Sequence, residues 1–160
     1  MATNTWDGSE GHSQWAHGAN WSLGSAPDAD DDVVIPDTSS LPNPELPADA
    51  TVNSLEIQAN GTLVGAGYTI TVDGEASSGN AVNIDGIISG NLDLNITTAA
   101  TTALDLLASS GNVRNLTINH ASCNALLSAA ASITGNLTIT AGELDTSGSN
   151  HALTVTGNTS

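Results

Sequence analysis

The residues best suited to chemistry are four carboxylates in one short segment near the amino terminus. Asp28, Asp30, Asp31 and Asp32 lie almost side by side in the sequence. Carboxylate oxygens are preferred protein ligands of Ca²⁺, so a calcium site is one interpretation. The spacing differs from that of an EF-hand loop, and no glycine lies inside the segment. The pattern therefore favours a solvated turn before the following strand, with Ca²⁺ as the alternative and no other cofactor expected.

The histidines, the other potential metal ligands, are mostly far apart. His12 and His17 could meet, but no third ligand of suitable type is fixed beside them. Zinc sites need three or four convergent ligands, so no zinc site is predicted. The single cysteine, Cys123, cannot form an intramolecular disulfide. Free cysteine behaves as a small apolar residue, and we expect Cys123 to be buried.

Three tryptophans, Trp6, Trp15 and Trp21, supply most of the aromatic residues of the chain. An exposed tryptophan offers a flat apolar face that can stack on a sugar, which would suit a carbohydrate-binding module. The alternative is that the tryptophans close one end of a stacked fold, because a terminal repeat needs a cap. We favour a cap or an interface for these three residues, together with Val33 and Ile35.

The motifs of common enzymes are absent from the sequence. It contains no Gly-x-Ser-x-Gly, no P-loop and no dinucleotide-binding fingerprint. Pectate-lyase-like and polygalacturonase-like β-helices combine aspartate clusters with Arg or Lys, whereas the only Arg or Lys here is Arg114. We therefore expect no catalytic residues and no enzymatic activity.

The charge of the chain restricts its partners. Seventeen acidic residues face one basic residue, which gives a net charge of −16 at pH 7. Nucleic acids and anionic lipids are bound through Lys and Arg, so neither a nucleic acid nor a membrane is expected as a partner. Proteins, carbohydrates or cations are expected instead. No signal peptide or membrane-spanning run is visible, which predicts synthesis in a cytoplasm without export by that route.

The elements that must position these residues are short strands repeated at a nearly constant interval. Ile96, Ile118 and Ile139 are separated by 22 and 21 positions. Intervals of 21, 24 and 22 separate a series of glycines: Gly90, Gly111, Gly135 and Gly157. Each interval can hold two or three strands with tight turns. We therefore predict an all-β fold, a single-stranded parallel β-helix (solenoid) with rungs of about 21–24 residues.

Residues 1–50 differ from the remainder because they contain all the prolines and tryptophans. Val33-Val34-Ile35 is their one clear strand, and Pro36 ends it. We predict an N-terminal cap and extended arm over 1–50, with the arm at roughly 36–49, and rungs over 51–160. Within the rungs, Thr98–Ala108 fits a helical turn, a strand or a loop.

Asparagines recur after glycines in the rungs, at Asn91, Asn112 and Asn136. They are either ordinary turn residues, which asparagine favours, or a stack of side chains hydrogen-bonded from rung to rung.

The opening segment resembles bacterial and phage-encoded β-strand-repeat surface proteins. The matching residues are Trp6-Asp7-Gly8, Trp15, Asn20-Trp21-Ser22, Pro27 and Asp31-Asp32-Val33-Val34-Ile35-Pro36. In such proteins a tryptophan-rich opening precedes an Asp-x-Val-x-Ile-like strand and rungs similar to residues 135–148. The resemblance implies a right-handed parallel β-helix that presents or braces a surface, and it implies no catalytic residue.

Three functional classes fit these observations. The preferred one is a structural virion protein, such as a capsid decoration (cement) protein or a short head or tail fibre. It would reach the virion surface after synthesis in the host cytoplasm and brace neighbours such as a major capsid protein. The second is an adhesin or surface-layer fragment at the bacterial cell surface, and the third is a carbohydrate-binding module. Because a solenoid end exposes a sheet edge, we also expect a homo-oligomer, for example a trimer.

Overall fold

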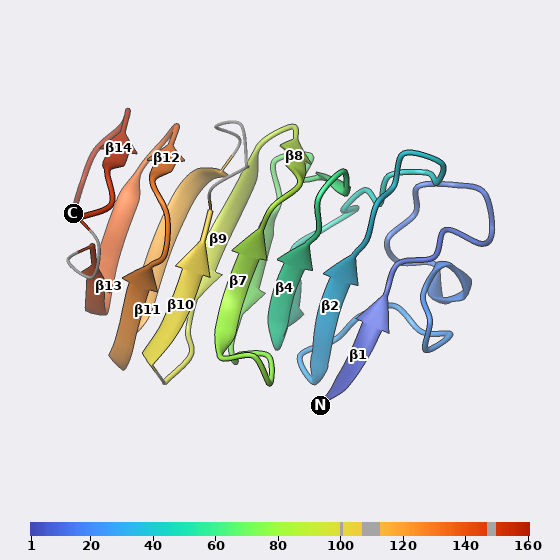
Figure 1. Cartoon of the computed structure of the whole chain (residues 1–160), viewed down its shortest axis with the longest axis horizontal. Helices are drawn as coiled ribbons and strands as arrows, with labels where there is room; N and C mark the ends of the chain where they lie inside the picture. Colours follow the sequence, from blue (N-terminus) through green and yellow to red (C-terminus); the bar gives the residue numbers. More distant parts are fainter. Residues whose placement is uncertain (100, 107–112, 147–149) are drawn as a thin grey trace.

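The chain forms a parallel β-solenoid of about five turns, as the sequence predicts (Figure 1). The computed structural model describes residues 1–99, 101–106, 113–146 and 150–160. Every ladder between its named strands is parallel. One short 3-10 helix, Gly18–Asn20, interrupts the N-terminal segment.

The strands lie on three sides of the solenoid. The first side contains β1 (Ala2–Thr5), β2 (Asp31–Ile35), β4 (Ser54–Ile57), β7 (Asn80–Ile84) and β10 (Thr101–Asp105). The second side contains β3 (Ala50–Val52), β6 (Thr69–Val72) and β9 (Leu92–Ile96). Two longer strands, β11 (Val113–Leu127) and β13 (Leu137–Asp145), run from the second side onto the first. The third side contains β5 (Thr62–Val64), β8 (Ile87–Ser89), β12 (Ala131–Ile133) and β14 (Leu153–Val155).

The strand register gives the length of each turn. On the second side Ile70 pairs with Leu94, Leu94 with Leu116 and Leu116 with Leu137, separations of 24, 22 and 21 positions. On the first side the separation is 22 positions between Val33 and Leu55, 27 between Leu55 and Val82, and 29 between Ala2 and Asp31. The extra residues lie in the loop 73–79 between β6 and β7 for the turn of 27, and in residues 6–30 between β1 and β2 for the turn of 29. The predicted rung length therefore holds for the second side from β6 onward, whereas β3 and β6 are 20 positions apart. Two turns of the first side are longer than predicted.

The core is a narrow column of branched side chains. Strand β2 has the burial pattern buried–intermediate–buried–intermediate–buried, so Val33 and Ile35 point inward. Other strands continue the column with Ile57, Ile84, Leu94, Leu116 and Ile118, all at most 1% exposed. Cys123 is buried as predicted, and burial raises the pKa of its thiol. Alternating inward residues therefore link each turn to the next.

The parallel ladder begins well before residue 50, where we placed the boundary between cap and rungs. β1 pairs with β2, and β2 pairs with β4, in one continuous sheet. Residues 36–49 do not project as an extended arm. Glu45 bridges to both Gln14 and Val64, and Leu46 is 1% exposed. This segment therefore packs on the third side of its own solenoid.

The segment Thr98–Ala108 contains a strand rather than a helical turn. β10 occupies Thr101–Asp105 and pairs with β7 and β11. The last residues of the predicted segment, 107–108, lie outside the described residues.

Gly86 marks a corner between β7 and β8 where the turns approach closely. A Cβ at this position would overlap the carbonyl oxygen of Gly61 and lie 2.5 Å from that of Gln58. Overpacking of this kind typically costs about 1–3 kcal/mol. We expect Gly86→Ala to lower the free energy of unfolding by this amount, measured by urea titration.

The control is Gly79→Ala, because a Cβ there would have no neighbour within 4 Å. Its φ of +83° alone predicts a cost of roughly 1–2 kcal/mol. If unfolding of Gly86→Ala were indistinguishable from that of the wild type, the close approach would not constrain this corner.

Candidate binding surface

A row of polar residues crosses the second side, one from each turn. The residue after each member pairs with its counterpart in the neighbouring turn. The strand register therefore places the members themselves side by side. The members are Asp49, Thr69, Asp93, Asn115, Asn136 and Asn158. Because adjacent parallel strands lie about 4.8 Å apart, a side chain in one turn can reach the backbone of the next.

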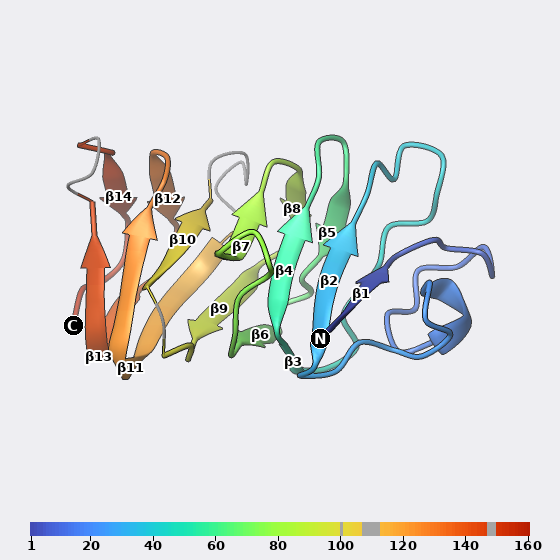
Figure 2. The same cartoon turned by 60° about the horizontal axis from the view of Figure 1, so that its bottom comes forward.

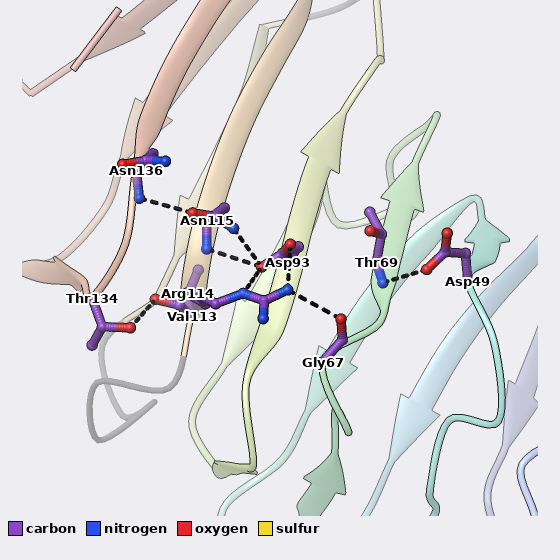
Figure 3. Close-up of polar contacts among 9 residues, drawn as sticks. All are labelled: Asp49, Gly67, Thr69, Asp93, Val113, Arg114, Asn115, Thr134 and Asn136. Carbon is purple, nitrogen blue, oxygen red and sulfur yellow. Dashed lines mark hydrogen bonds and ion pairs between the residues drawn. The ribbon is translucent and has the colours of Figure 1, made fainter. Parts of the chain in front are cut away.

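Side-chain oxygens in this row accept hydrogen bonds from backbone N–H groups of the following turn (Figure 3). Asp49 Oδ1 accepts from Thr69 N at 2.8 Å, and Asn115 Oδ1 accepts from Asn136 N at 2.8 Å. Asn136 Oδ1 in turn accepts from Asn158 N at 2.9 Å. Such bonds hold consecutive turns in register at the corner that precedes the second side.

Asp93 is the most connected member of the row. Its Oδ1 accepts from the backbone N and the Nδ2 of Asn115, at 3.2 and 3.0 Å. Arg114 donates to both carboxylate oxygens, from Nε to Oδ1 and from Nη2 to Oδ2, each at 2.8 Å. Arg114 Nη2 also donates to the carbonyl oxygen of Gly67 at 3.1 Å (Figure 3). The single Arg or Lys of the chain thus ties three turns together.

These contacts perturb both ionisable groups. Burial by itself would raise the pKa of the Asp93 carboxyl, but hydrogen bonds from Arg114 and Asn115, with the Arg114 charge, outweigh burial and lower this pKa. The hydrogen bonds and charge of Asp93 raise the pKa of Arg114. The Asp93 side chain is 20% exposed and the Arg114 side chain is 37% exposed, so the pair lies at the surface. Hydrogen bonds with Asn115 and Gly67 hold it on two sides.

A second outward row lies two positions further along each strand. Its members are short polar residues: Thr51, Thr71, Asn95, Thr117 and Thr138. Three of them, Asn95, Thr117 and Thr138, line a shallow depression over β6, β9, β11 and β13 together with four members of the first row: Thr69, Asp93, Asn115 and Asn136. Hydroxyl and amide groups in this depression can donate and accept hydrogen bonds. The surface can bind a polar partner, but its groups do not form a nucleophile–base pair.

The tryptophans lie inside the N-terminal end of the solenoid. Trp6, Trp15 and Trp21 are 0%, 4% and 2% exposed, and Trp21 contacts the other two edge to face. The indole N–H of Trp6 donates to Pro42 O, and that of Trp21 donates to Trp15 O. Their rings therefore form the centre of a cap, and none presents a face on which a sugar could stack.

The cap also covers the outer edge of β1. Ser22 N donates to Thr5 O at 2.9 Å, and Thr5 N donates to Ser22 Oγ at 2.9 Å. An uncovered strand edge invites pairing with another chain, and the segment after Trp21 blocks that edge. Val33 and Ile35, grouped with the tryptophans as cap or interface residues, are fully buried in the core.

The carboxylates of the acidic run, residues 28–32, belong to a turn and to a strand and do not form one cluster. Asp31 is buried, and its Oδ2 accepts from Asn4 Nδ2 and Asp28 N, both at 3.2 Å. Asp32 points outward and accepts from Asn53 Nδ2 and Ser54 Oγ. Asp28 Oδ1 accepts from Asp30 N at 2.9 Å. In the described part of the chain, no three Asp, Glu, His or Cys side chains converge as metal ligands.

The histidines are placed as the sequence suggested. The rings of His12 and His17 meet edge to face, with centroids 4.9 Å apart. Asn20 Nδ2 lies 3.2 Å from His12 Nδ1 and also donates to the backbone of the same loop. These contacts order the loop that leads to Trp15 and Trp21.

Sequence reasoning missed the Asp93–Arg114 ion pair. Its signal was present, because Arg114 follows Asp93 by 21 positions, the length of one rung. Of the two described members of the proposed asparagine stack, Asn136 lies in the observed row and Asn91 does not. Asn91 is exposed, and its carbonyl oxygen accepts from Gly67 N, while Asn112 lies outside the described residues.

In the described ranges, no helix is long and apolar enough to cross a membrane. Comparison with protein-family models, with curated proteins and with solved structures gives no significant match.

Proposed function

We propose that the chain is a structural virion protein, most specifically a phage capsid decoration (cement) protein or a short head or tail fibre. The observation that carries the proposal is the cross-linking of successive turns by side chains, from Asp49 to Asn158. A body held together in this way can transmit force between neighbours, as a brace must. The resemblance of the opening segment to β-strand-repeat surface proteins supports the same role.

The proposed role is mechanical and needs no catalytic residue. The partners are protein neighbours such as a major capsid protein, and further copies of the chain, for example in a trimer. The large negative charge supports a protein partner, because it repels nucleic acid and anionic lipid. The proposed location is the outer surface of the virion.

The bacterial cell surface is the alternative location, because the same resemblance includes bacterial surface proteins. A carbohydrate-binding role loses its original support, because the tryptophans that suggested it are buried. We therefore do not propose sugar binding through Trp6, Trp15 or Trp21.

Co-sedimentation tests the proposal. Purified protein is expected to pellet with shells assembled from the major capsid protein encoded in the same genome, and the binding should saturate. Shells of an unrelated phage are the control. A decorated shell should also dissociate at a higher temperature than a bare one, because a ligand stabilises the state it binds. Protein that stays in the supernatant at micromolar concentration would rule out the decoration role.

A further inference from the structure

A groove on the first side is walled by a loop and floored by outward-facing side chains. The loop is residues 73–79, which joins β6 to β7 and lies beside β4 and β7 (Figure 2). The residues that matter here are Asp32, Val34, Glu56, Asn83, Ser77 and Ser78. They come from three neighbouring strands, β2, β4 and β7, and from the loop.

The floor of the groove is set by the strand register. Val34 pairs with Glu56, and Glu56 pairs with Asn83, so the three form one outward row with about 4.8 Å between neighbours. Asp32 lies two positions before Val34 on the same strand. From the strand rise and spacing, the carboxylates of Asp32 and Glu56 are attached roughly 8 Å apart.

The wall of the groove is held in place by hydrogen bonds. Asn53 Nδ2 donates to Glu75 O at 3.0 Å at the start of the loop. Ala76 N donates to Asn80 O at 2.9 Å, and Gly79 N donates to Ala76 O at 2.8 Å. Because the wall is already ordered in the free protein, less conformational entropy is lost when a partner binds.

In the described part of the chain, no basic side chain contacts the carboxylates of the groove. Among the described residues, Asp32 accepts from the neutral donors Asn53 and Ser54, and Glu56 accepts from Gln58. The sole Arg or Lys of the sequence, Arg114, is already bound to Asp93 on the second side. The groove therefore carries negative charge that basic side chains of a partner could neutralise.

We propose that this groove binds an extended segment of a protein partner that carries basic side chains two positions apart, as in Arg-x-Arg. Two such side chains on one face of an extended segment are about 6.7 Å apart, close to the spacing of the two carboxylates. The amide of Asn83 and the hydroxyls of Ser77 and Ser78 can hydrogen-bond to the segment's backbone. The inference rests on the proposed function to the extent that the partner is a protein.

The test uses acetyl-Arg-Ser-Arg-amide, titrated into the full chain and followed by NMR. Amide shifts are expected at Glu56, Asn83 and residues 76–78. The same peptide with citrulline in place of both arginines is the uncharged control and should produce no saturable shifts. Added salt should weaken binding of the arginine peptide, because salt screens the interaction between exposed charges.

Substitutions locate the binding. Glu56→Gln should lower the affinity for the arginine peptide roughly two- to fivefold, and Asn83→Asp should raise this affinity by a similar factor. Glu143→Gln removes an equal charge from an exposed site in β13 and should change nothing. Equal effects of Glu56→Gln and Glu143→Gln, or equal shifts with the citrulline peptide, would overturn the inference.

Shell binding separates this inference from the proposed function. Wild-type protein that pellets with shells, together with Glu56→Lys protein that pellets equally well, would refute the groove as the docking site while the structural role stands. Saturable peptide binding without shell binding would support the groove and refute the decoration role.

Discussion

Replacing Trp21 by alanine is expected to lower the free energy of unfolding by about 3–5 kcal/mol, the usual cost of removing a buried tryptophan. Trp21 is 2% exposed and contacts Trp6 and Trp15, with ring centroids 5.1 and 4.7 Å away. Its removal also leaves Trp15 O without the indole donor at 2.7 Å. Since domains are stable by about 5–15 kcal/mol, this one substitution could remove a large part of the total.

The measurement is guanidinium unfolding followed by far-ultraviolet circular dichroism. Leu23→Ala is the matched control, because Leu23 is two residues away and 48% exposed. Its effect should stay within about 0.5 kcal/mol. Trp21→Phe should fall between the two, because it keeps an aromatic ring but loses the indole N–H. A Trp21→Ala variant as stable as Leu23→Ala would show that the cap contributes little to the stability of the solenoid.

The rungs could be predicted because their inward residues repeat in type as well as position. Ile96, Ile118 and Ile139, matched in the sequence by spacing alone, are direct register partners in the structure. Likewise Gly157 N donates to Gly135 O at 2.9 Å, from one turn to the one before. Where the same residue type recurs at the same corner, the separation of these residues in the sequence equals the number of residues in one turn.

The N-terminal turn was harder to predict because its inward residues are polar or interrupted by proline. In β1 the buried side chain is Asn4, whose amide donates to Ser25 O and Asp31 Oδ2. A buried asparagine gives no apolar alternation, so this strand left no pattern in the sequence. Glu45 joins the third side by isolated bridges between prolines, which is too short a segment for a strand signal.

The polar row was only partly predictable because residue identity changes from turn to turn. Asp, Thr and Asn all occupy it, and what they share is a position directly before a residue that pairs with the neighbouring turn. Asn136 was found because it follows a glycine, as Asn91 and Asn112 do. Asp93 and Asn115 follow Leu92 and Arg114 instead, and only the register shows that they are neighbours.

The Asp93 carboxylate makes the stability of the polar row depend on pH. Asp93→Ala should cost about 2–3 kcal/mol at neutral pH, because it removes a charged acceptor from Arg114 and Asn115. Folding lowers the pKa of Asp93, so the unfolded chain binds the proton more tightly. The stabilisation is therefore fully present above the unfolded pKa of about 3.9 and is lost as the pH falls through the lower folded value.

Urea unfolding of wild type and Asp93→Asn between about pH 7 and pH 3 isolates this effect. The variant keeps one oxygen acceptor but has no charge, so the stability difference from wild type should be largest at neutral pH and shrink in acid. Comparing differences matters because other carboxyls titrate in the same range, including Asp37, whose pKa is lowered by hydrogen bonds from Ser39. Asp85→Asn, at an exposed site, is the matched control and should change the free energy of unfolding by less than about 0.5 kcal/mol. A wild-type advantage over Asp93→Asn that stayed constant down to the lowest pH would mean that the charge of Asp93, and hence its pair with Arg114, does not hold the turns together.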